Sequence, residues 1–221
     1  MKTILFVQGL GMTKHEWNNS FDEIAGRLKD AGFTTVQFDF PIFVNDQTRE
    51  MPLSLRAKFV EKIAKKHKPD GLIAQSYGAI VSLIASLPTV KTQVLVSPAL
   101  SPMHSIKQVY EEVGMKINWE GDTTMPRSSG EHTTVGKEFW EDIKDFDDIH
   151  AARSINIPTC ILYGDHDTKI PVDVVQKFYE AIPVNKKLKI YKGGDHGIID
   201  VPRPMREEFL QDVVDWFQKT L

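Results

Sequence analysis

The residues best suited to do chemistry centre on a serine between a predicted strand and a predicted helix. Ser76 lies in the pentapeptide Ala74-Gln75-Ser76-Tyr77-Gly78, after the apolar run 71–74 and before the apolar run 77–85. A strained strand-to-helix turn needs small residues two positions before and after its serine. The helix start also offers free backbone N–H groups for a developing negative charge, and the first donor is the N–H of Tyr77. The alternative is a serine that only caps the helix.

A serine hydroxyl is a weak nucleophile at neutral pH, so it needs a base and an acid that orients the base. His196 follows the last predicted strand in the glycine-flanked turn 193–197, and Asp167 follows the preceding strand. Their order along the chain predicts Ser76 as nucleophile, His196 as base and Asp167 as the orienting acid. Asp165 remains the alternative candidate for the orienting acid. Taken singly, the aspartates could be ordinary turn residues and the histidine an exposed loop residue.

A third turn, Gln8-Gly9-Leu10-Gly11-Met12, follows the first predicted strand. A backbone N–H here can supply a second donor to an oxyanion, and we assign that role to Leu10. Met12 is expected to contact the substrate. The turn is not a dinucleotide fingerprint, because Lys14 stands where a third glycine is needed. No cofactor is implied.

The elements that must position these turns alternate along the chain. Short β-branched or aromatic runs alternate with segments of helical period, which predicts an α/β fold: a mainly parallel, six-stranded sheet with helices on both faces. We place the strands near residues 3–7, 34–40, 71–75, 93–97, 159–163 and 188–191. Apolar stripes predict helices around residues 21–28, 55–63, 77–87, 174–182 and 205–217.

A long segment, about residues 100–155, interrupts the alternation and has short predicted helices at its ends. Such an excursion in a small α/β domain is usually functional, so we expect a lid or cap over the site, with a surface loop as the alternative. Its large apolar residues Met103, Trp119 and Trp140 are expected to contact the substrate. The alternative for the tryptophans is that they anchor the insertion to the domain.

Composition sets the broad class. The chain has 221 residues, 41% hydrophobic and 26% charged, with a net charge of -3, so we expect one domain spanning residues 1–221. Basic residues form no stripe, which argues against nucleic acid as a partner. The single cysteine, Cys160, lies in an apolar run and is expected to be a buried small hydrophobe. We expect a cytoplasmic location and no membrane partner, because no apolar run suits a signal peptide or a membrane span. A homodimer stays open.

With these residues assembled, the chain resembles the α/β-hydrolase superfamily, in particular single-domain carboxylesterases close to the cinnamoyl or feruloyl esterases and the serine aminopeptidase-like hydrolases. The resemblance rests on the first turn, the serine turn, the turn 164–171 and Gly194-Asp195-His196. It departs at Gln8, where these proteins usually have histidine, and at Ala74, where they usually have glycine. The first two antiparallel strands of the superfamily also have no counterpart, which implies a minimal version of the fold.

The resemblance implies a serine hydrolase, and a carboxylesterase acting on small acyl or aryl esters is the expected activity. Thioesterases and peptidases use the same fold, so they stay open. A protein that only binds a small molecule is an alternative of a different class. A metal hydrolase using His166 with Asp165 and Asp167 is disfavoured, because no second histidine stands at a suitable spacing. We expect no metal site.

Overall fold

The computed structural model describes residues 1–44, 47–112, 114–126 and 132–221. Its main sheet has the strand order β10-β9-β6-β5-β1-β2, and each neighbouring pair is parallel. This confirms the predicted six-stranded α/β architecture. The strands are β1 (Thr3–Val7), β2 (Thr34–Val36), β5 (Gly71–Gln75), β6 (Thr92–Val96), β9 (Thr159–Gly164) and β10 (Lys186–Tyr191).

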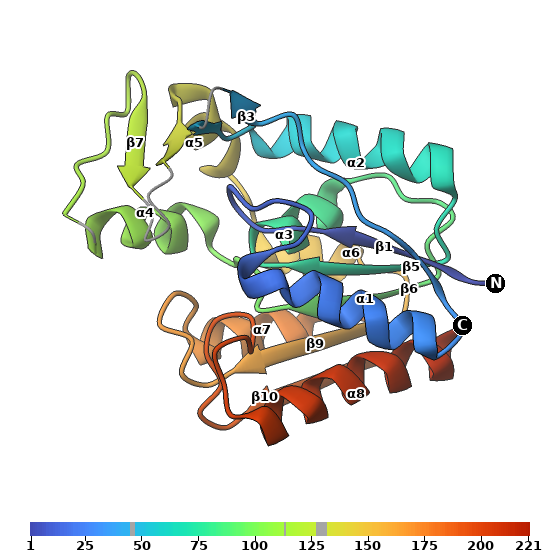
Figure 1. The fold of residues 1–221 in the computed structure, drawn as a ribbon. Coiled ribbons are helices and arrows are strands. Elements are labelled where there is room, and N and C mark those ends of the chain that lie inside the picture. Colours follow the sequence, from blue (N-terminus) through green and yellow to red (C-terminus); the bar gives the residue numbers. More distant parts are fainter. Residues whose placement is uncertain (45–46, 113, 127–131) are drawn as a thin grey trace.

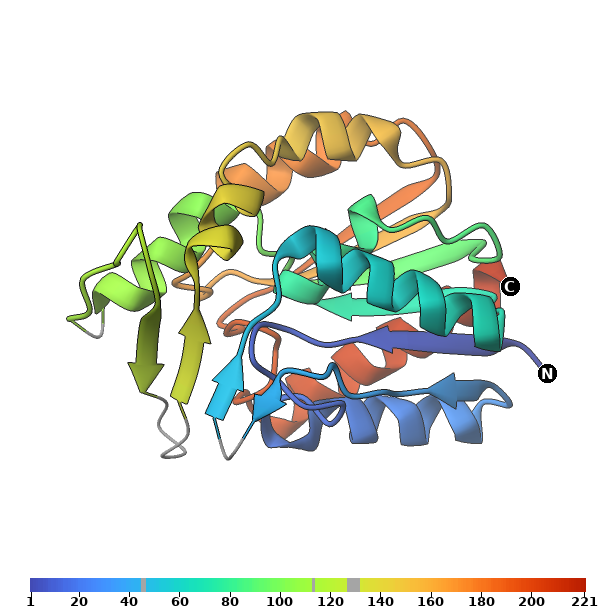
Figure 2. The same cartoon turned by 90° about the horizontal axis from the view of Figure 1, so that it is seen from above.

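Helices cover both faces of the sheet, and each face has its own apolar core (Figures 1 and 2). The helices α1 (Ser20–Asp30) and α8 (Arg203–Thr220) contact each other on one face. The other face is covered by α2 (Leu53–His67), α3 (Tyr77–Ile84), α6 (Asp148–Ser154) and α7 (Val172–Ala181). The central strands β5 and β6 are buried along their whole length, as strands covered on both faces must be.

Two predicted elements are shorter than expected. The third helix ends at Ile84 and not at residue 87: the backbone is already extended at Ala85 (φ −74°, ψ 138°), and Pro88 disfavours helical backbone at the residue before it. The second strand ends at Val36 and not at residue 40. Beyond its end, the carbonyl of Phe38 accepts a hydrogen bond from the side chain of Gln8 (2.9 Å), so this backbone group is satisfied outside the sheet.

The insertion after β6 contains more structure than the sequence predicted. It forms α4 (Pro102–Glu112), β7 (Thr123–Pro126), β8 (His132–Val135), α5 (Lys137–Ile143) and then α6. The antiparallel pair β7 and β8 joins a second antiparallel pair, β3 (Phe43–Val44) and β4 (Gln47–Arg49), through parallel pairing of β4 with β8. The result is a second sheet of order β3-β4-β8-β7, which the sequence did not predict.

The second sheet, α4 and α5 lie beyond the carboxyl ends of the main strands (Figures 1 and 2). The turns that follow β1, β5, β9 and β10 lie at this same edge, because all the main strands run in one direction. The edge therefore brings together the segments that contain the candidate site residues. Within the described part of the chain, no helix combines the length and apolar character needed to cross a membrane.

Candidate active site

Ser76 occupies a strained turn between β5 and α3. Its backbone has φ 52° and ψ −121°, in the left-handed half of the map that side chains with a Cβ avoid, at a cost of about 1–3 kcal/mol. Three backbone hydrogen bonds hold it there: its N–H donates to Val96, and its carbonyl accepts from Ala79 and Ala99. Although Ser76 is at the N-cap position, its hydroxyl makes no capping hydrogen bond. The serine is therefore not a simple helix cap.

The hydroxyl of Ser76 instead contacts His196. The distance from Ser76 Oγ to His196 Nε2 is 2.9 Å, and the distance from His196 Nδ1 to Asp167 Oδ2 is 2.7 Å. The Asp167 carboxylate is fully buried, and its other oxygen accepts hydrogen bonds from the N–H groups of Lys169 and Ile170. Ser76, His196 and Asp167 thus form one hydrogen-bonded chain, built from turns that are 91 and 29 residues apart in sequence.

Asp165, the alternative acid, lies elsewhere. Its side chain is exposed, and Oδ1 accepts the N–H of Gly193 at 2.5 Å. This contact ties the turn after β9 to the turn after β10. Asp165 therefore braces the loop that contains His196 without touching the imidazole in the described contacts.

Two glycines allow the close approaches that this arrangement needs. A Cβ on Gly78 would lie 2.3 Å from the carbonyl oxygen of Val7, so only glycine lets α3 start this close to β1. A Cβ on Gly164 would lie 2.3 Å from the carbonyl oxygen of Gly194. This second contact packs the turn of Asp167 directly against the turn of His196.

Tyr163 fixes the turn that contains Asp167. Its hydroxyl donates to the carbonyl of Ile170, three residues after the acid. Burial, with a smaller contribution from the nearby Asp167 carboxylate, raises the pKa of Tyr163 to about 12, so the phenol keeps its proton at neutral pH. The hydrogen bond therefore persists across the pH range in which a histidine base works.

The first turn lies beside the serine. The position of a Cβ on Gly9 would be 3.5 Å from the Cβ of Ser76. The N–H of Gly9 donates to Glu16 Oε2, and the N–H of Gly11 donates to Glu50 Oε2, both at 2.7 Å. The carbonyls of Gln8 and Gly9 both accept from Arg56 Nη1, each at 3.1 Å. The nearby Glu16 and the sequence-distant Glu50 and Arg56 thus hold the backbone of this turn.

A cavity of about 670 Å³ opens at Ser76 and His196, a size typical of a small-molecule site. Leu10, Met12 and Tyr77, which the sequence singled out, line it. Its other apolar walls are Trp17, Ala99, Ile106, Val109, Ile170 and Ile199, and its polar lining includes Glu16, Gln75, Ser105, His166, Lys169 and Asp200. Within the insertion, α4 supplies Ser105, Ile106 and Val109.

The large insertion residues that the sequence singled out are not among the residues that line this cavity. Trp140 is buried and packs edge-on against Tyr110 and Phe139, while Trp119 is 42% exposed and packs on Trp140. Met103 packs against the apolar core. This differs from the expected substrate contacts. The ring contacts of both tryptophans lie within the insertion, and only Trp140 also belongs to the apolar core that the insertion shares with the main sheet, as the anchoring alternative expects. The insertion residues of α4 that line the cavity are the smaller Ser105, Ile106 and Val109.

The sequence analysis missed Glu16, Glu50 and Arg56. One signal could have found Arg56: it falls on the buried stripe of α2, together with Leu53, Ala57 and Val60, and a charged residue on an apolar stripe implies a buried partner. Glu50 precedes the helix in a region without helical or strand period, so no pattern marks it as that partner.

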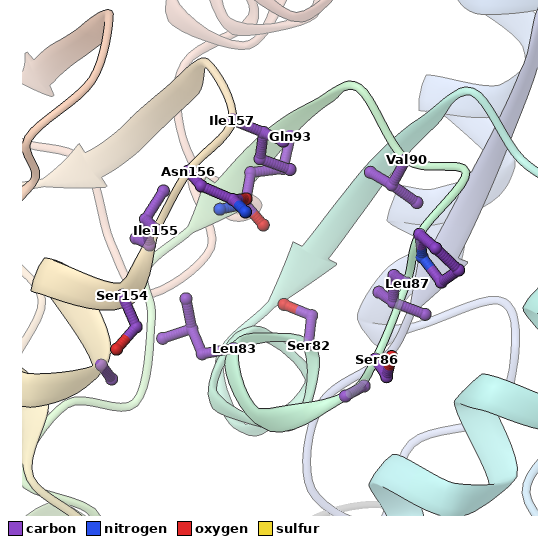
Figure 3. A pocket seen from close by; sticks show the side chains of 13 residues that line it. Ser82, Leu83, Ser86, Leu87, Val90, Gln93, Ser154, Ile155, Asn156 and Ile157 are labelled. Atoms are coloured by element: carbon purple, nitrogen blue, oxygen red, sulfur yellow. The ribbon is translucent and has the colours of Figure 1, made fainter.

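A second cavity, of about 390 Å³, lies at the C-terminal end of α3, where Ser82 and Leu83 line it (Figure 3). Its described lining carries no charged side chain and consists of residues such as Leu83, Ser86, Ile155 and Asn156. The Ser82 hydroxyl, which also lines it, donates to the carbonyl of Ala79. This cavity offers no nucleophile paired with a base.

Other chemistries have little support in the described residues. Cys160 is fully buried, as expected, and burial raises the pKa of its thiol to about 12, so the thiolate needed for nucleophilic attack is scarce. Across residues 1–44, 47–112, 114–126 and 132–221, no three His, Cys, Asp or Glu side chains are grouped so that they could hold a metal ion.

Comparison with known proteins supports the fold. A monoacylglycerol lipase from Paleococcus ferrophilus is 19% identical and superposes with a TM-score of 0.76, over 99% of this chain and 95% of that one. Est1E from Butyrivibrio proteoclasticus, in a structure with bound ferulic acid, is 16% identical with a TM-score of 0.79, over 100% of this chain and 89% of that one. The protein therefore has the α/β-hydrolase fold.

The sequence comparisons are more limited. No family model matches the chain. A non-heme chloroperoxidase, CPO-A1 from Kitasatospora aureofaciens, is 35% identical over 82 residues, which are 37% of this chain and 26% of that protein. The chain thus matches about a quarter of the length of this relative.

Proposed function

We propose that the protein is a serine hydrolase that cleaves carboxylic esters of small acyl or aryl substrates through an acyl-enzyme intermediate. The observation that carries the proposal is the hydrogen-bonded chain from Ser76 to His196 to Asp167, open to a cavity of about 670 Å³. A nucleophile, a base and an orienting acid in this geometry are the parts that acyl transfer requires.

In the first half of the reaction, Ser76 Oγ attacks the ester carbonyl and His196 Nε2 takes the hydroxyl proton. Asp167 accepts the Nδ1–H of the imidazole, which fixes the tautomer and stabilises the imidazolium. The carbonyl oxygen becomes an oxyanion, for which we propose the N–H groups of Leu10 and Tyr77 as donors. The tetrahedral intermediate then expels the alkoxide, which takes the proton from His196 and leaves as the alcohol.

In the second half, a water molecule attacks the acyl-enzyme. His196 takes one proton from the water, the same N–H groups stabilise the second oxyanion, and the carboxylic acid leaves as the proton returns to Ser76 Oγ. No cofactor or metal takes part in this proposal. The substrate is a free small molecule, without nucleic acid or membrane as partner, and we propose a cytoplasmic location.

The proposed substrate class is based on the lining of the cavity and on the structural relatives. Apolar side chains such as Leu10, Ile106 and Val109 can bury the part of a substrate that does not react. The relatives include a monoacylglycerol lipase and an esterase with bound ferulic acid. Together they support small acyl and aryl esters. The insertion acts in this proposal as a cap, with α4 as the part that faces the substrate.

The first prediction tests for the enzyme. We expect a fluorophosphonate probe to label the folded protein on Ser76, because the probe needs a serine activated by a base, and we expect no labelling of Ser76→Ala. In a panel of matched esters, thioesters and amides, we expect kcat/KM to be highest for short acyl and aryl esters. A folded protein that binds esters without labelling or turnover would support the binding-protein alternative. Faster turnover of aminoacyl amides or of thioesters would support a peptidase or a thioesterase.

The second prediction concerns specificity. Val109 lies in α4 and lines the cavity, so Val109→Trp should fill space that a long acyl chain needs. We expect kcat/KM for octanoyl or feruloyl esters to fall by about tenfold or more, while that for acetyl esters changes little. Trp119→Ala is the matched control, because Trp119 belongs to the same insertion but does not line the cavity. If only the Trp119 variant changed the ranking of esters by kcat/KM, residues outside α4 would determine the substrate specificity.

A further inference from the structure

We propose that Arg56 and Glu50 are positioning residues that set the direction of the Leu10 N–H, and with it one half of the oxyanion site. This inference rests on the proposed function and adds to it a buried ion pair that neither touches the substrate nor forms part of the reacting chain. Neither residue is among those that line the active-site cavity.

The ion pair is fully buried and has fixed geometry. Both side chains are 0% exposed; Arg56 Nε contacts Glu50 Oε1 at 2.6 Å, and Nη2 contacts Oε2 at 2.7 Å. The guanidinium also lies over the ring of Phe40, 4.2 Å from its centroid, and near the ring of Tyr77. A planar fork held by two bonds and a ring cannot rotate freely, so its remaining Nη1 points in one direction.

That remaining nitrogen, Nη1, holds the first turn. It donates to the carbonyls of Gln8 and Gly9. The Gly9–Leu10 peptide is planar and trans, so its C=O and its N–H point in opposite directions. Because Arg56 holds the carbonyl on the buried side, the N–H of Leu10 is directed away from Arg56, on the side where Leu10 lines the cavity and Gly9 approaches Ser76.

Glu50 holds the next peptide of the turn, Leu10–Gly11. Its Oε2 accepts the N–H of Gly11 at 2.7 Å while it accepts from Arg56, so one carboxylate anchors both the guanidinium and the residue after Leu10. A buried ion pair is a weak source of stability, because desolvation offsets its attraction. The pair holds three backbone groups of the first turn, the carbonyls of Gln8 and Gly9 and the N–H of Gly11. We therefore assign it the role of orienting this turn.

The test measures how Arg56→Lys changes kcat and the affinity for a transition-state analogue, compared with its effect on KM. Lysine keeps the charge but has no planar fork, so it cannot hold Glu50 and both carbonyls together. We expect kcat for a short ester to fall about 100-fold, as for loss of one oxyanion donor, with KM within about threefold. Affinity for a trifluoromethyl ketone, which forms a tetrahedral adduct with the serine, should fall by a similar factor. An unchanged kcat and ketone affinity would overturn the inference.

Further measurements separate the possible failures. Val213→Ala in α8 lowers stability in the other apolar core and is the control for destabilisation alone; an equal loss of kcat there would overturn the inference. If Arg56→Lys does not fold, Glu50→Gln should show the same fall of kcat at constant KM. In a structure of the wild-type adduct, the ketone oxygen must lie within hydrogen-bond distance of the Leu10 N; contact with other donors only would overturn the inference. If the wild-type protein neither turns over esters nor forms the adduct, the proposed function itself fails.

Discussion

Replacing Ser76 with alanine is expected to lower kcat for ester hydrolysis by about 10³-fold or more, with the midpoint of thermal unfolding little changed. The hydroxyl is the only group removed, and its hydrogen bond in the structure is to His196, so the fold loses little with it. His196→Ala should lose about as much activity. The double variant should have nearly the same kcat as either single variant. Attack by the serine and transfer of its proton to the histidine occur together, so the loss of either residue already abolishes both.

A matched control for this prediction is Ser82→Ala. Ser82 lies on the same helix, α3, and is buried, but its hydroxyl donates to a backbone carbonyl away from the reacting chain. Removal of the Ser82 hydroxyl should lower the midpoint of thermal unfolding and leave kcat close to the wild-type value. Strictly additive losses for the Ser76 and His196 variants, or near-wild-type turnover by Ser76→Ala, would exclude the proposed mechanism.

Asp167→Asn is expected to lower kcat by about 10³- to 10⁴-fold. Oδ1 of Asp167 accepts two backbone N–H groups, so the amide oxygen of asparagine must take that position. The amide NH₂ then faces His196 Nδ1 and donates to it. The imidazole proton is consequently forced onto Nε2, which faces Ser76, and this tautomer cannot accept the serine proton. kcat measured on a short ester, with the unfolding midpoint of each variant, tests this expectation.

Asp165→Asn is the paired control. Its side chain accepts only the Gly193 N–H among the described contacts, and an asparagine oxygen can still do so, so kcat should fall by less than about tenfold. If Asp165→Asn gave the large loss and Asp167→Asn the small one, the role of the orienting acid would pass to Asp165.

Much of the main sheet could be predicted from sequence because its strands are short, apolar and separated by helices of clear period. β5 and β9 are buried along their length, and buried parallel strands are recognisable as continuous apolar runs. The positions of Ser76, Asp167 and His196 followed from the same fact. Once the strands are placed, their carboxyl ends share one edge, and the residues after them must lie close together.

The second sheet could not be predicted in this way. Its strands have two to four residues, and the pairing of β4 with β8 joins residues 85 positions apart, such as Thr48 and Thr133. Pairing over that distance leaves no local period, and strands of two to four residues are too short to show the alternation that marks a half-buried strand. The placement of Trp119 was missed for a related reason: a large apolar residue in an insertion packs equally well on a neighbouring ring or on a substrate, and sequence does not distinguish the two.

The second sheet links the insertion to the first turn, which limits how the insertion can be exchanged between related proteins. The N–H of Glu50 donates to the carbonyl of Thr134 at the end of β8, while the carboxylate of the same residue holds Gly11. The insertion is thus joined through one residue to the backbone beside the serine. It is not an exchangeable module: a graft of residues 100–155 from a relative would also need the matching segment 43–50. An exchange of the insertion without segment 43–50 is expected to remove the hydrogen bond between Glu50 and Thr134, and so to disturb the first turn as well as the wall of the cavity.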